Sequence, residues 1–344
     1  MTPLVSVIVP CRNEAGYIAA CVESILATTY PHDRLEVLVV DGRSDDGTRQ
    51  IVTSLAQRDP VIRLLDNPRR VVPAALNVGI RAARGEIIVR MDGHATYPPD
   101  YLPGLVRALQ ESGADNVGGR IVTLPADGSA TARAIAVALA HPFGVGNSYF
   151  RIGAPQRRWV DTVCYGCFRR DVFRRVGLFD EELIRNQDDE FNHRLLRAGG
   201  RILLAPEVVS YYYGRRTRRQ IARMYYQYGY YKPLVVRKVG GVMTLRQLVP
   251  PAFLITITAG LIAALVSRAA AAIWLGLIGT YGLAVIGAAA AAIRTRGLRC
   301  AAALITVFPV LHLSYGAGYL AGLYRAWVRR GGTWDEPAAV PLSR

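Results

Sequence analysis

The sequence lacks several features that would point to common classes of protein. Its five cysteines are odd in number and scattered, which is not the pattern of a disulfide framework and suits a reducing compartment. No basic stretch precedes the short apolar run at residues 4–9, and Pro10 interrupts it, so we expect no signal peptide. Zinc-finger spacing, a basic region with heptads and an RNA-binding aromatic signature are also missing, so we expect no nucleic-acid partner.

Lysine is scarce, whereas arginine is abundant. The 344 residues include 42 Lys and Arg, of which only Lys232 and Lys238 are lysines, and 26 Asp and Glu, which gives a formal net charge of +16. Basic pairs precede an apolar C-terminal region, at Arg169-Arg170, Arg174-Arg175, Arg215-Arg216 and Arg218-Arg219. This placement favours contact with a membrane surface that carries anionic lipid head groups.

Three long segments near the C-terminus carry no charge. They are Leu248–Val266, Ala269–Ile293 and Cys300–Tyr324, and each reaches the ~20 helical residues that cross a ~30 Å hydrocarbon layer. We therefore predict about three transmembrane helices. Gly318 and Gly322 form a GxxxG pattern, which would let a neighbouring helix approach closely, although ordinary small-residue packing is the alternative.

The charges between these segments predict an orientation. The first connection carries Arg268 alone, while the second carries more basic residues, so the positive-inside rule keeps the second connection and the N-terminal region in the cytoplasm. We expect a multi-pass protein of the inner (plasma) membrane. Three full crossings conflict with the same rule, because they place Arg325, Arg329 and Arg330 outside; either the last segment is re-entrant or the rule fails here.

The N-terminal region alternates short apolar runs with helical patterns. Predicted strands are Val5–Val9, Glu36–Val40, Ile62–Leu65 and Ile87–Met91, and predicted helices are Ala15–Ala27, Asp46–Ala56 and Ala74–Arg84. Continuously apolar strands are buried on both faces, and repeated βα units build a parallel, doubly wound sheet whose ligands bind at the carboxyl ends of the strands. The sequence has no GxGxxG after the first strand and no GxxxxGK[ST], which disfavours a dinucleotide cofactor and a P-loop.

Polar residues follow these strands. Asp41 ends an apolar strand, where its carboxylate can accept hydrogen bonds from a base or ribose, whereas Asp45 and Asp46 fit a helix cap. Asp92 and His94 follow the fourth strand, and their oxygen and imidazole groups could hold a divalent cation, with a simple glycine turn as the alternative.

A third acidic cluster opens a helical pattern at residues 186–190. Asp188 shares its helix face with Phe191 and Leu195, which makes it an inward-facing carboxylate. Asp189 and Glu190 fit first-turn carboxylates that the helix dipole stabilises.

Taken together, these motifs resemble inverting glycosyltransferase family 2. The resemblance covers residues 3–210 and rests on residues 5–14 (VSVIVPCRNE), 39–48 (VVDGRSDDGT), 84–92 (RGEIIVRMD) with Asn77 before them, and 187–191 (QDDEF). It implies a GT-A fold, an α/β doubly wound and mostly parallel sheet, here followed by a transmembrane helical region. Residues 74–77 and 90–98 resemble the succinoglycan-type exopolysaccharide glucosyltransferases more closely.

The resemblance also implies roles for single residues. Asp188 matches the family's catalytic base, although Gln187 replaces the usual Glu before it, and His94 replaces the second Asp of the metal-binding DxD motif. Residues 220–223 are similar to the QxxRW motif of processive members, but Met224 replaces its Trp, so processivity is not supported. The implied nucleotide-sugar ligands are Pro10, Arg12, Glu14, Asp41, Asn77 and Asp92, and a divalent cation, Mn²⁺ or Mg²⁺, would bind at Asp92 and His94.

The activity that the resemblance implies is transfer of a sugar from a nucleotide-diphosphate sugar to a hydroxyl of a lipid-linked saccharide, with UDP-hexose as the expected donor. The catalytic domain would lie in the cytoplasm and work with other polysaccharide-assembly enzymes. One alternative is transfer to polyprenyl phosphate, which needs no general base. Another is a non-catalytic nucleotide-sugar-binding or assembly protein, against which the intact Asp41, Asp92 and Asp188 argue.

We therefore expect four regions along the chain. They are a glycosyltransferase domain at 1–210, a basic and aromatic interfacial segment at 211–247, a membrane region at 248–324 (helices 248–266, 269–293 and 300–324) and a polar tail at 325–344.

Overall fold

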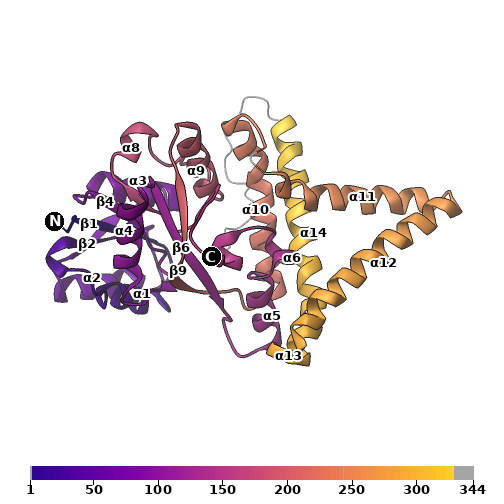
Figure 1. Ribbon diagram of the computed structural model, residues 1–344, viewed down its shortest axis with the longest axis horizontal. Coiled ribbons are helices and arrows are strands. Elements are labelled where there is room, and N and C mark those ends of the chain that lie inside the picture. Colours follow the sequence, from indigo (N-terminus) through magenta and orange to yellow (C-terminus); the bar gives the residue numbers. More distant parts are fainter. Residues whose placement is uncertain (1, 243, 329–344) are drawn as a thin grey trace. The chain divides into compact units, whose positions relative to one another are not determined.

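A computed structural model describes residues 2–242 and 244–328 of the chain (Figure 1). These residues form two compact units, the first made of 2–122 and 149–213 and the second of 123–148 and 214–328. The first unit ends close to the domain end predicted at residue 210. Residues 123–148, which the sequence-based division kept in the glycosyltransferase domain, instead belong to the second unit, because their helices pack there. From residue 329 on, the predicted polar tail lies outside the described residues.

Four parallel strands form one half of the sheet in the first unit. Their order is β3-β2-β1-β4, and helical crossovers join them in sequence, as the alternating βα pattern predicts. The strands are β1 (Val5–Cys11), β2 (Leu35–Asp41), β3 (Ile62–Asp66) and β4 (Ile87–Arg90), and the helices are α1 (Ile18–Leu26), η1 (His32–Arg34), α2 (Thr48–Arg58) and α3 (Val72–Ala82).

The other half of the sheet is antiparallel, so the sheet as a whole is mixed rather than mostly parallel. β8 pairs antiparallel with β4 and β6, and β9 pairs antiparallel with β5 and β7. Antiparallel neighbours do not require the helical crossover that joins parallel strands, so the chain can reverse its direction in this half of the sheet. The elements are β5 (Ala95–Thr96), α4 (Tyr101–Ser112), β6 (Asn116–Leu124), α7 (Tyr149–Ile152), β7 (Arg158–Trp159), β8 (Cys167–Arg169), α8 (Val172–Arg175), α9 (Gln187–Arg197) and β9 (Ile202–Tyr213).

The core of the first unit covers both faces of the parallel strands. In β1, Val7 and Val9 belong to the hydrophobic cluster that α1, α2 and α4 cover, while Ile8 belongs to the cluster under α3 and α9. This double burial explains why these strands are apolar without alternation. Because both faces of these strands are buried, polar side chains that can reach a ligand lie at the carboxyl ends of β1, β2 and β4.

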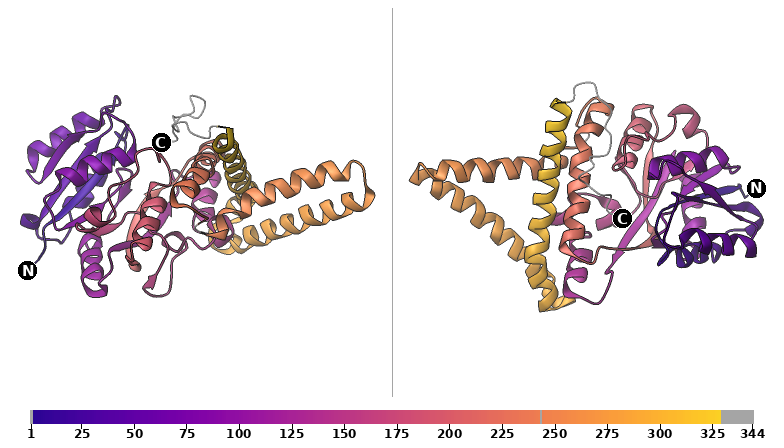
Figure 2. Two further views of the ribbon diagram at one scale, coloured as in Figure 1. Left: turned by 90° about the horizontal axis from the view of Figure 1, so that it is seen from above. Right: turned by 180° about the vertical axis from the view of Figure 1, so that it is seen from behind.

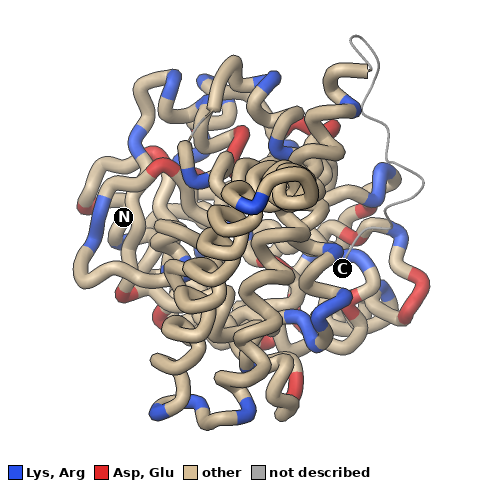
Figure 3. Tube along the Cα trace, turned by 90° about the vertical axis from the view of Figure 1, so that its right-hand side faces the viewer, with Lys and Arg blue, Asp and Glu red and all other residues tan. Residues whose placement is uncertain are grey.

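The second unit is helical. Its elements are α5 (Ala130–Ala138), α6 (Pro142–Val145), α10 (Arg218–Val239), η2 (Leu245–Gln247), α11 (Val249–Ala264), α12 (Arg268–Ala291), α13 (Ile293–Arg296) and α14 (Leu298–Val328). Three of its helices are long and apolar enough to cross a membrane: Leu245–Ala264, Arg268–Ala291 and Leu298–Val328. Figure 3 shows α11 and α12, which face the viewer there, almost without charged residues. The three predicted apolar segments are thus confirmed as helices.

α10 and α14 run side by side and in the same direction (Figure 2). A Cβ on Gly318 would stand 2.0 Å from the carbonyl oxygen of Tyr226, and one on Gly322 would stand 2.2 Å from that of Tyr230. The GxxxG prediction is therefore confirmed, and the neighbouring helix is α10. Of the predicted interfacial segment, residues 211–213 end β9 in the sheet, and Tyr230 and Tyr231 are buried in the second unit. Contact of the remaining residues with a membrane stays a prediction.

Candidate active site

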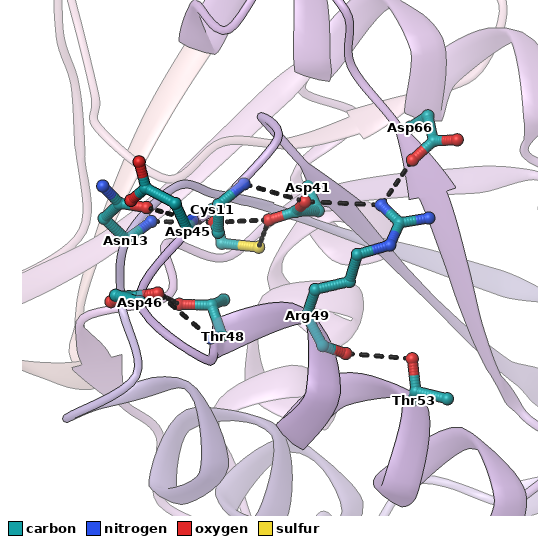
Figure 4. A network of polar contacts seen from close by, with 10 residues as sticks. Cys11, Asn13, Asp41, Asp45, Asp46, Thr48, Arg49, Thr53 and Asp66 are labelled. Carbon is teal, nitrogen blue, oxygen red and sulfur yellow. Dashed lines mark hydrogen bonds and ion pairs between the residues drawn. The ribbon is translucent and has the colours of Figure 1, made fainter.

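The loops that follow β1 and β2 are tied to each other at the carboxyl edge of the sheet (Figure 4). The backbone N–H of Asn13 donates to Ser44 Oγ at 2.9 Å, and the N–H of Asp45 donates to Asn13 Oδ1 at 3.1 Å. Asn13 and Arg43 both adopt φ = 56°, a left-handed conformation that asparagine tolerates better than most residues. These bonds fix the shape of the loop pair before any ligand binds.

Asp41 is fully buried at the end of β2 and helps to shape the second loop. Its carboxylate accepts hydrogen bonds from Ser44 Oγ at 2.5 Å and from the Ser44 N–H at 3.1 Å, and Arg49 Nη1 lies 3.4 Å away. Asp46 accepts from the N–H of Thr48, the first residue of α2, at 3.0 Å. Asp46 thus stabilises the helix start, as its sequence position suggests, although Gly47 is the N-cap.

Pro10 and Arg12 lie at the end of β1. Pro10 is buried within the strand, whereas Arg12 is exposed just beyond it. A Cβ on Gly42 would stand 3.2 Å from Arg12 Cβ, so the arginine stem lies against the second loop. Gly93 approaches the same strand end, since its Cβ would stand 3.4 Å from Cys11 Cβ. The loops after β1, β2 and β4 therefore meet at one edge, as the sequence predicts.

Arg90, the last residue of β4, links the two candidate catalytic regions. Its guanidinium holds both carboxylate oxygens of Asp92, with Nε 2.7 Å from Oδ1 and Nη2 3.0 Å from Oδ2. Its third nitrogen, Nη1, donates to Asp188 Oδ1 at 2.5 Å. The Arg90 side chain is only 7% exposed. One buried cation therefore brings Asp92 and Asp188 together from β4 and α9, and the sequence analysis assigned it no role.

The charges of this cluster shift its pKa values. Burial raises the pKa of the Asp188 carboxyl above its usual range, and the neighbouring Asp92 adds to the rise while Arg90 opposes it. Burial by itself would lower the pKa of Arg90, but Asp188 and Asp92 hold it above the ordinary arginine value. A carboxylate with a raised pKa is a stronger base than a solvated one, which suits a group that accepts a proton.

α9 presents its first-turn carboxylates in different directions. Phe191 and Leu195 are fully buried, and Asp188 keeps 25% of its side chain exposed at the edge of that face, within reach of a substrate. Asp189 accepts a hydrogen bond from Thr162 Oγ1 at 3.1 Å. Glu190 is buried and paired with Arg194, so it has a specific structural partner in addition to the helix dipole proposed from the sequence.

His94 is oriented by a buried carboxylate. Its Nδ1 lies 3.0 Å from Glu14 Oε1, and since a carboxylate only accepts, Nδ1 carries the proton and donates it. This bond leaves Nε2 as the nitrogen that can bind a ligand. Glu14 thus contacts His94 in the arrangement by which carboxylates orient metal-binding histidines. Its binding of the nucleotide, which the resemblance implies, stays a prediction.

Asn77 lies apart from this group. Its side-chain amide donates to the carbonyl of Phe179 at 2.9 Å and to Glu181 Oε1 at 2.8 Å, and its Oδ1 accepts from the N–H of Phe179 at 2.9 Å. The structure thus uses Asn77 to hold the loop before α9. Its binding of a nucleotide stays a prediction.

Asp92 and His94 offer ligand types that Mn²⁺ and Mg²⁺ accept, with Glu14 as an outer partner. The part of the chain that the structure describes holds no cluster of three or more His, Cys, Asp or Glu side chains arranged around a metal position. Two protein ligands fit a cation that substrate phosphates and water complete, which is the usual way Mg²⁺ is held. These two protein ligands therefore fit a cation that also binds the substrate better than a cation held by protein ligands alone.

Comparison with known proteins identifies the family. Residues 6–177 match the model of Glycosyl transferase family 2. The chain belongs to this family. It is 34% identical over 247 residues, 71% of this chain and 73% of the relative, to the succinoglycan biosynthesis protein ExoA of Rhizobium meliloti (strain 1021). This relation confirms the resemblance seen in the motifs, and the protein is a glycosyltransferase.

The chain is also similar to an archaeal transferase with a lipid-linked sugar in its name and to a solved structure of a mannosyltransferase. A relative in Methanococcus voltae, named dolichyl N-acetyl-alpha-D-glucosaminyl phosphate 3-beta-D-2,3-diacetamido-2,3-dideoxy-beta-D-glucuronosyltransferase, is 30% identical over 242 residues, 68% of this chain and 74% of that protein. The mannosyltransferase PcManGT of Pyrobaculum calidifontis, solved with GDP-Man and Mn²⁺, superposes with a TM-score of 0.57 at 23% identity, covering 94% of this chain and 88% of that one. The latter similarity establishes the GT-A fold.

Proposed function

We propose that this family 2 glycosyltransferase moves a hexose, with inversion, from a nucleotide-diphosphate sugar to a hydroxyl of a lipid-linked saccharide during polysaccharide synthesis. The observation that carries the proposal is the contact of Arg90 with both Asp92 and Asp188. It puts the candidate base next to the group expected at the donor diphosphate. UDP-hexose is the donor we expect.

Each residue has a distinct task in this reaction. Asp188 removes the proton of the acceptor hydroxyl during attack, because an unassisted hydroxyl is a poor nucleophile. Arg90 keeps Asp188 oriented, and the loops that hold Pro10, Arg12 and Asp41 bind the nucleoside. A divalent cation, when bound at Asp92 and His94, would supply charge neutralisation for the leaving diphosphate. Attack from the face opposite the diphosphate inverts the anomeric centre.

The acceptor is inferred from two features. The second unit carries three helices apolar enough to cross a membrane, which would hold the enzyme at the surface where lipid-linked saccharides are found. The name of the Methanococcus relative describes transfer onto a dolichyl-phosphate-linked sugar, and ExoA is named for succinoglycan biosynthesis. We propose a multi-pass inner-membrane protein whose first unit lies in the cytoplasm, and other polysaccharide-assembly enzymes as its partners.

The test uses the full-length protein in detergent, a panel of nucleotide sugars and a membrane extract as the source of acceptor. Release of nucleoside diphosphate identifies the donor. In Asp188→Asn, transfer to a hydroxyl acceptor should fall about 10²–10⁴-fold, the usual cost of losing a general base, while donor affinity survives. Asp189→Asn, the matched control, should keep most activity because Asp189 contacts Thr162 rather than Arg90.

Two results would change the assignment. Transfer that is insensitive to Asp188→Asn and proceeds with polyprenyl phosphate alone would favour the lipid monophosphosugar reaction, which needs no base. Binding of a nucleotide sugar without turnover in the presence of acceptor extract would favour a non-catalytic binding or assembly protein.

A further inference from the structure

In the second unit, α11 and α12 contact each other, but they cross α14 at an angle rather than run along it (Figure 1). α11 starts from the C-terminal half of α14, where a Cβ on Gly316 would stand 2.7 Å from the carbonyl oxygen of Pro250. α12 returns to the N-terminal half of α14, where Val285 and Ala289 share a buried cluster with Leu304. Between these attachments, α11 and α12 project from α14 as a hairpin (Figures 1 and 2).

The register of α10 against α14 directs the first arginines of α10 toward the middle of α14. The pairs Tyr226 with Gly318 and Tyr230 with Gly322 have the same offset along two parallel helices. Continued toward the helix start, that offset places Arg218 and Arg219 next to residues 310 and 311, at the centre of the uncharged stretch 300–324. Both arginines are exposed. If α14 crossed a bilayer, α10 would carry these charges to its hydrocarbon centre, where arginine is among the costliest residues.

The segment that contains α5 and α6 also contacts α14. His312, midway along it, donates from Nε2 to the carbonyl of Phe143 at 2.8 Å, and its Nδ1 lies 2.9 Å from the hydroxyl of Tyr281, which donates to it. Phe143 belongs to the short α6, in the same segment as Asp127, which pairs with Arg216 at 3.0 Å. Loops and ion pairs of this kind do not occur in lipid-exposed positions at hydrocarbon depth.

The hairpin has the opposite character. Leu265, Val266, Ile273 and Leu283 are between 71% and 87% exposed, and Arg268, at the tip, is the one charged residue among the described residues 247–293. Its arms are joined by the indole N–H of Trp274, which donates to the carbonyl of Ile257 at 2.9 Å. The spans of 20 and 24 residues extend about 30 Å and 36 Å at ~1.5 Å per residue, enough to cross the ~30 Å hydrocarbon layer.

We propose that the α11–α12 hairpin alone crosses the phospholipid bilayer, and that α14 lies at the bilayer surface with α10. The hairpin then begins and ends on the same side of the bilayer. The basic residues at the hairpin base, Arg294, Arg296 and Arg299, and those near the end of α14 share that side with the first unit. This arrangement satisfies the positive-inside rule, which three crossings violate.

The first test locates the two ends of the full-length chain. An epitope tag is placed at each end, and protease is added to right-side-out and to inside-out vesicles from a bacterial host. We expect both tags to be cleaved in the inside-out vesicles only, and the chain to resist carbonate extraction. Cleavage of the two tags in opposite vesicle types would overturn the proposal, and so would release of the wild-type chain by carbonate, which would show mere surface adsorption.

A matched pair of variants tests which helix contacts lipid. Leu283→Arg places a charge on the exposed face of α12, and Ile305→Arg places one on an exposed position of α14 that is 44% accessible. We expect Leu283→Arg to shift the membrane insertion equilibrium about a hundredfold and to raise the carbonate-extractable fraction, while Ile305→Arg matches wild type. Equal sensitivity of both variants, or greater sensitivity of Ile305→Arg, contradicts a surface position for α14.

Discussion

Replacing Arg90 gives the most direct test of how the active site is held together. The guanidinium makes three hydrogen bonds to two carboxylates, Asp92 and Asp188. Arg90→Gln removes the charge and leaves both carboxylates beside each other with no cation between them. Arg90→Lys keeps one charge, but a single ammonium group cannot reproduce the planar fork that holds Asp92 at two points and Asp188 at a third.

The size of the effect follows from burial. Removing one partner from a buried ion pair typically costs 3–5 kcal/mol. Since Asp188 is 25% exposed and Asp92 13% exposed, we expect about 3 kcal/mol in the free energy of unfolding for Arg90→Gln. In addition, the turnover of Arg90→Gln should be about 10²–10⁴-fold lower than that of the wild type, because the general base loses its orientation. Arg90→Lys should recover part of the stability and less of the turnover.

The pH dependence separates a positioning role from a merely structural one. Arg90 lowers the pKa of Asp188, so its removal raises that pKa. The base works only when ionised, and activity is lost as the pH falls through its pKa. The acid limb of kcat/KM for Arg90→Gln should therefore move to higher pH, and by less in Arg90→Lys.

The assay is steady-state release of nucleoside diphosphate from pH 5 to 9, with chemical denaturation run in parallel. A variant that is destabilised yet keeps the wild-type kcat and acid limb refutes the positioning role. A change confined to the KM for the donor would show that Arg90 serves Asp92 and donor binding only.

Three further predictions concern other contacts. Chelator should abolish turnover and Mn²⁺ restore it; full activity in excess chelator excludes the cation. Glu14→Ala should weaken the apparent metal affinity about 10–100-fold, because it removes the acceptor that orients His94. Gly318→Ala should lower the melting temperature in detergent, because its Cβ would stand 2.0 Å from a carbonyl oxygen of α10. The control is Gly276→Ala, whose Cβ would have nothing within 4 Å; it should leave the melting temperature unchanged or raise it. Asn77→Ala should lower stability by about 1–3 kcal/mol through the unpaired Phe179 N–H; an unchanged melting temperature with a raised donor KM would show instead that Asn77 binds nucleotide.

The sequence by itself determined the local structure of the glycosyltransferase half. Residues such as Val7, Ile8 and Val9 predict a strand buried on both faces, because apolar side chains in continuous succession need cover on either side of a sheet. The carboxyl ends of such strands meet at one edge of a parallel sheet, so the sequence predicts that Asp41, Asp92 and His94 lie at that edge. The three apolar helices also follow from composition, since residues 248–324 offer few charges to solvate.

The tertiary structure decided what depends on partners far apart in the sequence. Arg90 looks in the sequence like the end of a strand, and only the docking of α9 against the sheet puts Asp188 beside its guanidinium. The contact of Glu14 with His94 likewise joins residues that lie 80 positions apart in the sequence. The apolar stretch of α14 satisfies the length rule for a membrane span, which counts residues of one segment only. The backbone of α10 and α6, which contacts α14, is contributed by other segments, so the environment of α14 cannot be judged from its own sequence.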